Sequence, residues 1–199
     1  MKAEFSLGKV RVKLVNGLPG VRFGAGAART DFEISQTNDS LKIKQVHDLE
    51  LADDAMTLRV INEPPHLLVS LPIGTYLNLT CKLGAIVANG FTCCTSRIEL
   101  GAGVVSLIGL QTEKIQAQVD DGIIRVSHSL IAQKASLTVK NGMLLVKDSI
   151  RSEQGYNASC DNGVLRCFGN FELGNKHHVT RPGKVIWQLC CDSGILNAS

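Results

Sequence analysis

Apolar and polar residues alternate along much of this chain, and the alternation is organised around a recurring glycine. These pivot glycines recur every 19 to 21 residues and a last one follows after 31; they are Gly84, Gly103, Gly122, Gly142, Gly163 and Gly194. The positions five and three before each glycine, and two and four after it, hold only apolar or cysteine residues. Such alternation is the period of a β-strand with one buried face. The pattern predicts an all-β repeat protein.

The nearly constant period favours stacked coils over separate hairpins. In a stack, each coil places the same position above its predecessor at a strand spacing of about 4.8 Å. The competing interpretation is a meander of hairpins, because Asn141-Gly142 between two apolar runs is also typical of a hairpin turn. A meander of hairpins does not explain why apolar residues recur at the same four positions around each glycine. We therefore expect a β-solenoid of about five to six coils, with the glycines at corners that need a positive φ.

In the first part of the chain, the residue pattern predicts short strands instead of coils. Residues 32–34 and 41–44 alternate, and residues 37–40 between them are typical of a hairpin turn. We expect a capping strand region over residues 1–72 and the solenoid repeats over residues 73–199. The long step from Gly163 to Gly194 predicts an insertion near residues 171–184 that leaves the coil as a loop.

Acidic residues gather at the predicted corners. Asp120, Asp161 and Asp192 lie two residues before a pivot glycine, and Asp121 lies one residue before. Stacked acids suit calcium binding, or acid and base work on a polysaccharide. The alternative is a solvated corner, in which Lys140 stacks between Asp120 and Asp161 and offsets their repulsion. Aromatic residues make up only 5% of the chain, which disfavours sugar stacking. We treat the four acids as candidate binding residues and expect no catalytic residue, metal or cofactor.

The remaining positions between the apolar columns are mostly polar, with Val87, Leu145 and Cys190 as exceptions. The chain has seven cysteines, and an odd number argues for reduced thiols instead of a disulfide framework. Cys160 and Cys191 share one inward column, where a small apolar role is expected. The vicinal pairs Cys93-Cys94 and Cys190-Cys191 lack zinc-type spacing, and strand alternation sends one thiol of each pair inward.

Charge and hydropathy exclude two classes of partner. The formal net charge of the 199 residues is +3 and the basic residues are scattered, so no nucleic-acid partner is expected. No apolar stretch reaches the roughly 18 residues of a transmembrane segment. The first residues contain no apolar signal-peptide core. Together with the cysteines, this predicts a cytoplasmic location, or an envelope-associated one if an export signal has been removed.

One segment resembles a known family. Residues 69–79, VSLPIGTYLNL, are similar to the "V-x-V-P-x-G-x-x-L-x-L" opening of the bacterial putative-adhesin β-solenoid family. The later Asp121-Gly122, Asn141-Gly142 and Asn162-Gly163 are similar to its repeated N/D-G coils. The resemblance covers residues 30–199 and implies a right-handed single-stranded parallel β-helix. It implies adhesion as the family role and supplies no catalytic motif.

These observations predict a non-enzymatic β-solenoid scaffold or binding protein with an unknown protein or glycan partner. Two alternatives stay open: a polymerising, bactofilin-like scaffold, and a polysaccharide-acting enzyme that uses the corner aspartates. The last pivot glycine lies five residues before Ser199. We therefore expect an open C-terminal coil that is covered by self-association into a homo-oligomer.

Overall fold

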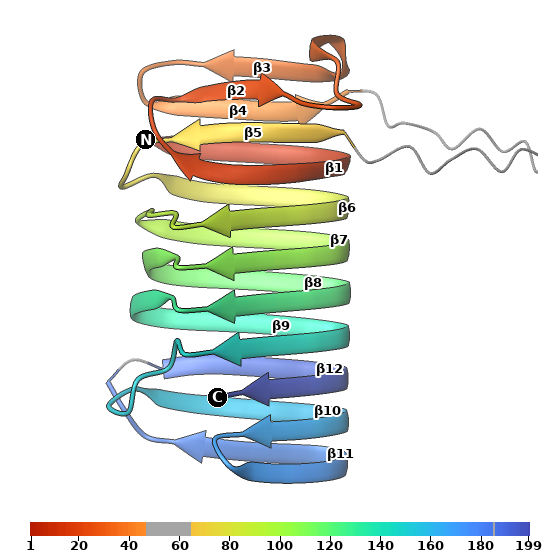
Figure 1. Cartoon of the computed structure of the whole chain (residues 1–199), viewed down its shortest axis with the longest axis vertical. Coiled ribbons are helices and arrows are strands. Elements are labelled where there is room, and N and C mark those ends of the chain that lie inside the picture. The colour runs from red at the N-terminus through yellow and green to blue at the C-terminus, as the bar shows by residue number, and fades with distance from the viewer. Residues whose placement is uncertain (47–64, 185) are drawn as a thin grey trace, which may run out of the picture.

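The computed structural model describes residues 1–46, 65–184 and 186–199 and consists almost entirely of strands joined by short turns (Figure 1). The twelve strands belong to one sheet. They are β1 (Lys2–Asn16), β2 (Gly20–Phe23), β3 (Phe32–Gln36), β4 (Ser40–Gln45), β5 (His66–Leu71), β6 (Tyr76–Asn89), β7 (Thr95–Ile108), β8 (Gln111–Ser127), β9 (Leu130–Lys147), β10 (Gly155–Cys167), β11 (Asn170–Arg181) and β12 (Ile186–Ala198). The only helical segment among the described residues is the 3-10 turn η1 (Arg29–Asp31). The all-β prediction is confirmed; residues 47–64 of the predicted capping region lie outside the described residues.

Each of the strands β6 to β10, and β12, bends at its pivot glycine. We call the part before the bend the first leg and the part after it the second leg; Figure 1 shows these bent strands lying one above another. The pivot glycines pair in register from strand to strand, with φ between +131° and +147°. A Cβ at Gly122 would overlap the carbonyl oxygen of Gly103, and the same contact recurs at every bend. Both space and backbone conformation therefore require glycine there.

The core lies between the two legs. All four predicted apolar columns point into it: in β6, for example, Leu79, Cys81, Ile86 and Ala88 are buried. The columns continue from strand to strand because parallel neighbours pair without a shift from β6 through β10 except for one irregularity near Thr112. The core is therefore a set of side-chain ladders along the stack.

The stack begins with β1, earlier than predicted. β1 pairs in parallel with β6 from Lys2 to Leu14, and Val10 stands opposite Gly84 at the bend. On its other side β1 pairs with β4 only along residues 2–6 and with β5 only along residues 11–16. No strand in the described part of the chain stacks over Val10, so the contact that requires glycine in later coils does not arise. The missing glycine is why the pattern did not identify this strand as part of the stack.

Antiparallel strands close the N-terminal end. β3 pairs with β4 and β2 pairs with β5, both antiparallel. The first pair is the hairpin predicted around residues 37–40, which is confirmed. An antiparallel edge strand ends a parallel stack, because the chain turns back instead of rising to another coil.

The C-terminal end differs from the prediction in two ways. Residues 171–184 do not form a loop, because most of them belong to β11, which pairs antiparallel along the whole of β10. The prediction of an open C-terminal coil is also wrong. The last strand, β12, lies between β9 and β10 and pairs in parallel with both (Figure 1). β11 is the outermost strand at this end, and the strand order is β9-β12-β10-β11.

A buried polar contact holds β12 in this inserted position. The connection from β9 to β10 has to pass the place that β12 fills, and its Gln154 is buried. The Trp187 Nε1–H of β12 donates to Gln154 Oε1 at 3.0 Å. Arg181, at the end of β11, donates to the Gln154 carbonyl oxygen at 3.0 Å and lies over the Tyr156 and Phe168 rings. These contacts tie together the three segments that the insertion brings side by side.

Candidate functional site

The predicted corner acids lie on the outer side of the bends, and neighbouring polar side chains bind two of them. Asp120 Oδ1 lies 2.8 Å from Lys140 Nζ and accepts a hydrogen bond from Gln118 Nε2 at 3.2 Å. Asp121 Oδ1 accepts one from Asn141 Nδ2 at 2.9 Å. Each bond joins side chains of one strand or of two adjacent strands. Asp120 and Asp121 therefore take part in the ladder that runs along the corner.

The insertion of β12 changes the order of charges at this corner. Asp192 lies between the register pairs Cys191–Val139 and Ser193–Asn141, so it faces Lys140 from the next strand. Asp161 follows one strand further out. The expectation that Lys140 stacks between Asp120 and Asp161 is therefore wrong, and Asp192 takes the second place. The corner sequence becomes acid, base, acid, acid.

The neighbours of Asp120 favour its ionised form. The hydrogen bond from Lys140 holds the pKa of Asp120 below its usual value, with a smaller contribution from Gln118. Asp120 in turn raises the pKa of Lys140. A general acid for glycoside hydrolysis needs the opposite shift, because it must keep its proton near neutral pH. The arrangement suits a charged structural corner better than acid catalysis.

The inward cysteines bind the backbone near the corners. Cys160 and Cys191 stand in register, and each thiol contacts a pivot-glycine carbonyl oxygen at 3.8 Å. Burial raises the pKa of Cys191 to about 12 and those of Cys81 and Cys167 to about 11. A raised pKa keeps the thiol protonated and poorly nucleophilic. These thiols behave as buried apolar side chains.

The vicinal cysteines divide as predicted. Cys93 and Cys191 are buried, whereas Cys94 and Cys190 are partly exposed. All seven cysteines are free thiols. In the described part of the chain, no three His, Cys, Asp or Glu side chains gather closely enough to hold a metal ion.

A polar pair covers the core at the β11 end. Glu172 stands opposite Leu165 and His177 opposite Cys160, so both occupy positions whose partners in β10 point inward. Glu172 Oε2 and His177 Nδ1 are 2.9 Å apart, and the His177 side chain is 18% exposed. The predicted insertion therefore supplies the polar lid that a stack of apolar coils needs at its end.

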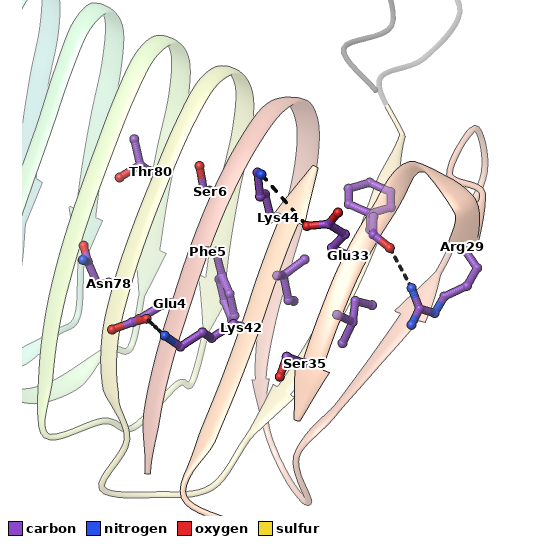
Figure 2. A pocket seen from close by; sticks show the side chains of 13 residues that line it. Glu4, Phe5, Ser6, Arg29, Glu33, Ser35, Lys42, Lys44, Asn78 and Thr80 are labelled. Carbon is purple, nitrogen blue, oxygen red and sulfur yellow. Dashed lines mark hydrogen bonds and ion pairs between the residues drawn. The ribbon is translucent and has the colours of Figure 1, made fainter. Parts of the chain in front are cut away.

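A hollow of about 770 Å³ lies across β3, β4, β1 and β6, near the N-terminal end (Figure 2). Its cations are engaged by the protein itself. Lys42 Nζ lies 3.0 Å from Glu4 Oε2, and Lys44 Nζ lies 4.0 Å from Glu33 Oε2. Arg29 donates to the Phe32 carbonyl oxygen at 2.7 Å. Hydroxyl and amide groups line the rest of the polar wall. This mixed surface suits a polar, uncharged ligand better than a strongly charged one.

The outer surface of the first legs is polar along the whole stack. We call two columns of it the first-leg outer face. From β1 to β11 they hold Glu4, Asn78, Arg97, Gln116, Ser136, Gln188, Asn157 and Thr180, and Ser6, Thr80, Glu99, Gln118, Thr138, Cys190, Ser159 and His178. Hydroxyl and amide side chains dominate. No Val, Ile, Leu, Met or Phe is among them, as expected for a solvated sheet face.

The outer surface of the second legs is mainly apolar. The corresponding columns, which we call the second-leg outer face, hold Arg11, Ala85, Val104, Ile123, Met143, Ile195, Val164 and Leu173, and Lys13, Val87, Ser106, Arg125, Leu145, Asn197, Arg166 and Phe171. Phe171 and Leu173 are 61% and 62% exposed, and Val104 and Ile195 are each 37% exposed. The other apolar side chains of the two columns are half-buried. A continuous, partly exposed apolar surface of this kind is typical of an interaction site.

Sequence reasoning missed this face although its signal was present. The sequence pattern marks Val87, Leu145 and Cys190 as the exceptions among the mostly polar positions between the buried columns. The position one residue after every pivot glycine is also apolar, from Ala85 to Ile195. Because the chain bends at the glycine, alternation restarts there and this position points outward. The bend, and not the composition, decides which side it faces.

No helix in the described part of the chain is long and apolar enough to cross a membrane. No family model matches the chain, and no curated protein matches it either. Among solved structures, the chain resembles a protein from Clostridium sporogenes described as a putative cell adhesion protein. The two are 13% identical, the match covers 99% of this chain and 92% of that one, and the TM-score is 0.47. A likeness at this level does not bear on function.

Proposed function

We propose that this protein is a non-enzymatic β-solenoid scaffold, right-handed and of adhesin-like type, that binds a partner through its outer surface. The observation that carries the proposal is the difference between the two outer faces. Burial of the core explains the inward columns, but it does not require aliphatic side chains on an outer face. A binding role explains the aliphatic side chains on that face.

The corner geometry supports a scaffold more than the polysaccharide-acting alternative. Asp120 and Asp121 are held by Lys140 and Asn141 of the neighbouring strand. The pKa of Asp120 is lowered by its Lys140 partner, where an acid catalyst needs it raised. If Asp161→Ala or Asp192→Ala abolished hydrolysis of a polysaccharide by the wild type, the non-enzymatic proposal would fall.

Sedimentation velocity of the reduced full-length protein over a concentration series tests the scaffold proposal. Antiparallel strands lie at both ends of the stack, and end-to-end growth would have to add to them. We expect a monomer or a small closed oligomer at every concentration. Growth into large, salt-tolerant species would instead support the bactofilin-like polymer.

A further inference from the structure

The second-leg outer face combines aliphatic side chains with cations. Its only charged residues are Arg11, Lys13, Arg125 and Arg166, and its sixteen positions include no carboxylate. None of the four forms an ion pair within the described residues. Their charge is therefore available to a partner.

The cations flank the apolar stripe along the length of the stack. Arg11 and Lys13 lie in β1 at one end, Arg125 in β8 near the middle, and Arg166 in β10 near the other end. With neighbouring strands about 4.8 Å apart, the eight strands of the face span about 34 Å. Lys147, beside Ser127 at the rim, adds a further cation.

The C-terminal end of the face is hollowed. A hollow of about 520 Å³ is lined by Arg166, Asn197 and Phe171 of the face, by Phe168 and Gly169 of the adjoining β10–β11 turn, and by Ala198 and Ser199. It places a guanidinium, an amide and a half-exposed aromatic ring around one concavity. A guanidinium and an amide are common donors to phosphate oxygens.

The charge and shape of the face together indicate what kind of partner it binds. A second copy packed face to face would bring cations against cations, with no carboxylate on either face to offset them. The column one residue after the bend is apolar in every strand from β6 to β12, and this repetition offers no unique register to a shape-specific protein partner. A lipid bilayer surface is laterally uniform and needs no register.

We infer that the second-leg outer face docks onto the surface of an anionic lipid bilayer. Phe171, Leu173 and the exposed aliphatic side chains enter the headgroup boundary, while Arg125 and Arg166 contact lipid phosphates. Burial of apolar area and attraction to anionic headgroups add together in such interfacial binding. The inference rests on the proposed function, because it names the partner of the face through which the scaffold is proposed to bind.

Co-sedimentation with vesicles tests this directly. The full-length protein is mixed with vesicles of equal parts phosphatidylserine and phosphatidylcholine, or of phosphatidylcholine alone. We expect binding to the anionic vesicles and little to the neutral ones. In the double variant Arg125→Glu/Arg166→Glu, partitioning onto anionic vesicles should fall by on the order of 100-fold or more, because each Lys or Arg at the surface contributes to the attraction.

A charge-matched control separates the face from net charge. Lys114→Glu/Lys134→Glu makes the same change in net charge on exposed first-leg positions of β8 and β9. We expect this variant to bind anionic vesicles within a few-fold of the wild type once net charge is allowed for. Equal losses in the two double variants would overturn the assignment to the second-leg face.

A second double variant tests the apolar part of the face, at exposed positions where substitution should not disturb folding. Phe171→Asn/Leu173→Asn changes two half-exposed side chains of the edge strand and should leave thermal unfolding nearly unchanged. Binding that persists at high salt in the wild type should fall at least about tenfold in this variant, because salt screens only the charge contribution. The control Leu18→Asn/Ile73→Asn alters exposed turn residues that are not among the sixteen positions of the face, and it should not change binding at high salt.

Three results would overturn the inference. The first is failure of the wild type to bind anionic vesicles. The second is unchanged binding in a folded Arg125→Glu/Arg166→Glu variant. The third is a stable dimer in solution that Phe171→Asn/Leu173→Asn disrupts, because the face would then be covered by a second copy. Neither of the first two results contradicts the scaffold proposal, which the sedimentation series tests separately.

Discussion

The two outer faces of this stack are built from the same strands, yet their chemistry differs. First-leg positions such as Thr80, Gln118 and Thr138 carry hydroxyl and amide groups, whereas Ile123 and Met143 occupy equivalent second-leg positions. Packing against the core treats both legs alike, since the inward columns of both are buried. The difference shows that the chemistry of the outer faces is not set by packing against the core, and it is the basis for proposing the second-leg outer face as the contact surface.

The bend that separates the faces should be the most sensitive feature. Gly122→Ala places a Cβ against the carbonyl oxygen of Gly103 at a φ of +147°. We expect the free energy of unfolding to fall by at least about 3 kcal/mol, from strain and steric overlap together. Urea unfolding measures the loss.

Gly174→Ala in β11 is the matched control. Gly174 also has a positive φ, of +120°, but the nearest atom to its Cβ would be His177 Nε2 at 3.5 Å. Backbone strain alone should cost about 1 kcal/mol. Equal losses for the two variants would show that strain, and not the stacked carbonyl, requires glycine at the corner.

Adjacent isoleucines measure the difference between core and outer face. Ile124 is fully buried, whereas Ile123 lies on the second-leg outer face and is half-buried. We expect Ile124→Thr to lower the free energy of unfolding by about 3 kcal/mol, because it removes apolar volume and buries a hydroxyl. Ile123→Thr should cost less than about 1 kcal/mol. If the outward change cost as much, the face would be part of the core in solution.

Thiol labelling tests the alternation on the first-leg side. Cys190 is partly exposed and Cys191 is buried, with a pKa raised by burial. In the native, reduced protein we expect Cys94 and Cys190 to react with a thiol reagent at least about tenfold faster than the other five cysteines. Cys190→Ser should remove one equivalent of the fast phase. Loss of that equivalent from Cys191→Ser instead would reverse the assigned orientation.

The smallest effect is expected at the charged corner. The pKa of Asp120 is lowered in the folded state, so its contribution is fully present above the usual aspartate value of 3.8. It is lost as the pH falls below that value, through the folded pKa. The urea midpoint of Asp120→Asn should therefore depend slightly less on pH in the acid range than that of the wild type. Identical acid profiles would mean that the pair with Lys140 contributes nothing, as for many exposed pairs.

Much of the fold could be predicted because the same sequence pattern recurs in each repeat. Six pivot glycines and four apolar columns predicted the bends, the buried positions and the strand class. The hairpin of β3 and β4 followed from local turn chemistry around residues 37–40. By contrast, the glycine pattern did not identify β1, because Val10 stands where the later strands need glycine.

The candidate site was predicted less well. The corner acids were found, but their order was not, because Asp192 comes next to Lys140 only through the insertion of β12. The second-leg outer face was missed, although alternation with the buried columns placed the positions one and three after each glycine outward, because solvent exposure alone predicts polar residues there. The polar pair of Glu172 and His177 lay in a segment that was expected to be a loop.

The repeat, the bend at each glycine and the set of buried positions could be predicted from the sequence, because these depend on local conformation and on a two-residue period. The neighbours of each strand at the C-terminal end depend instead on tertiary contacts. Parallel strands of this repeat present nearly the same edge to any neighbour, so local pattern does not distinguish β12 from β10 beside β9. Contacts between distant segments, such as Trp187 with Gln154, accompany that choice.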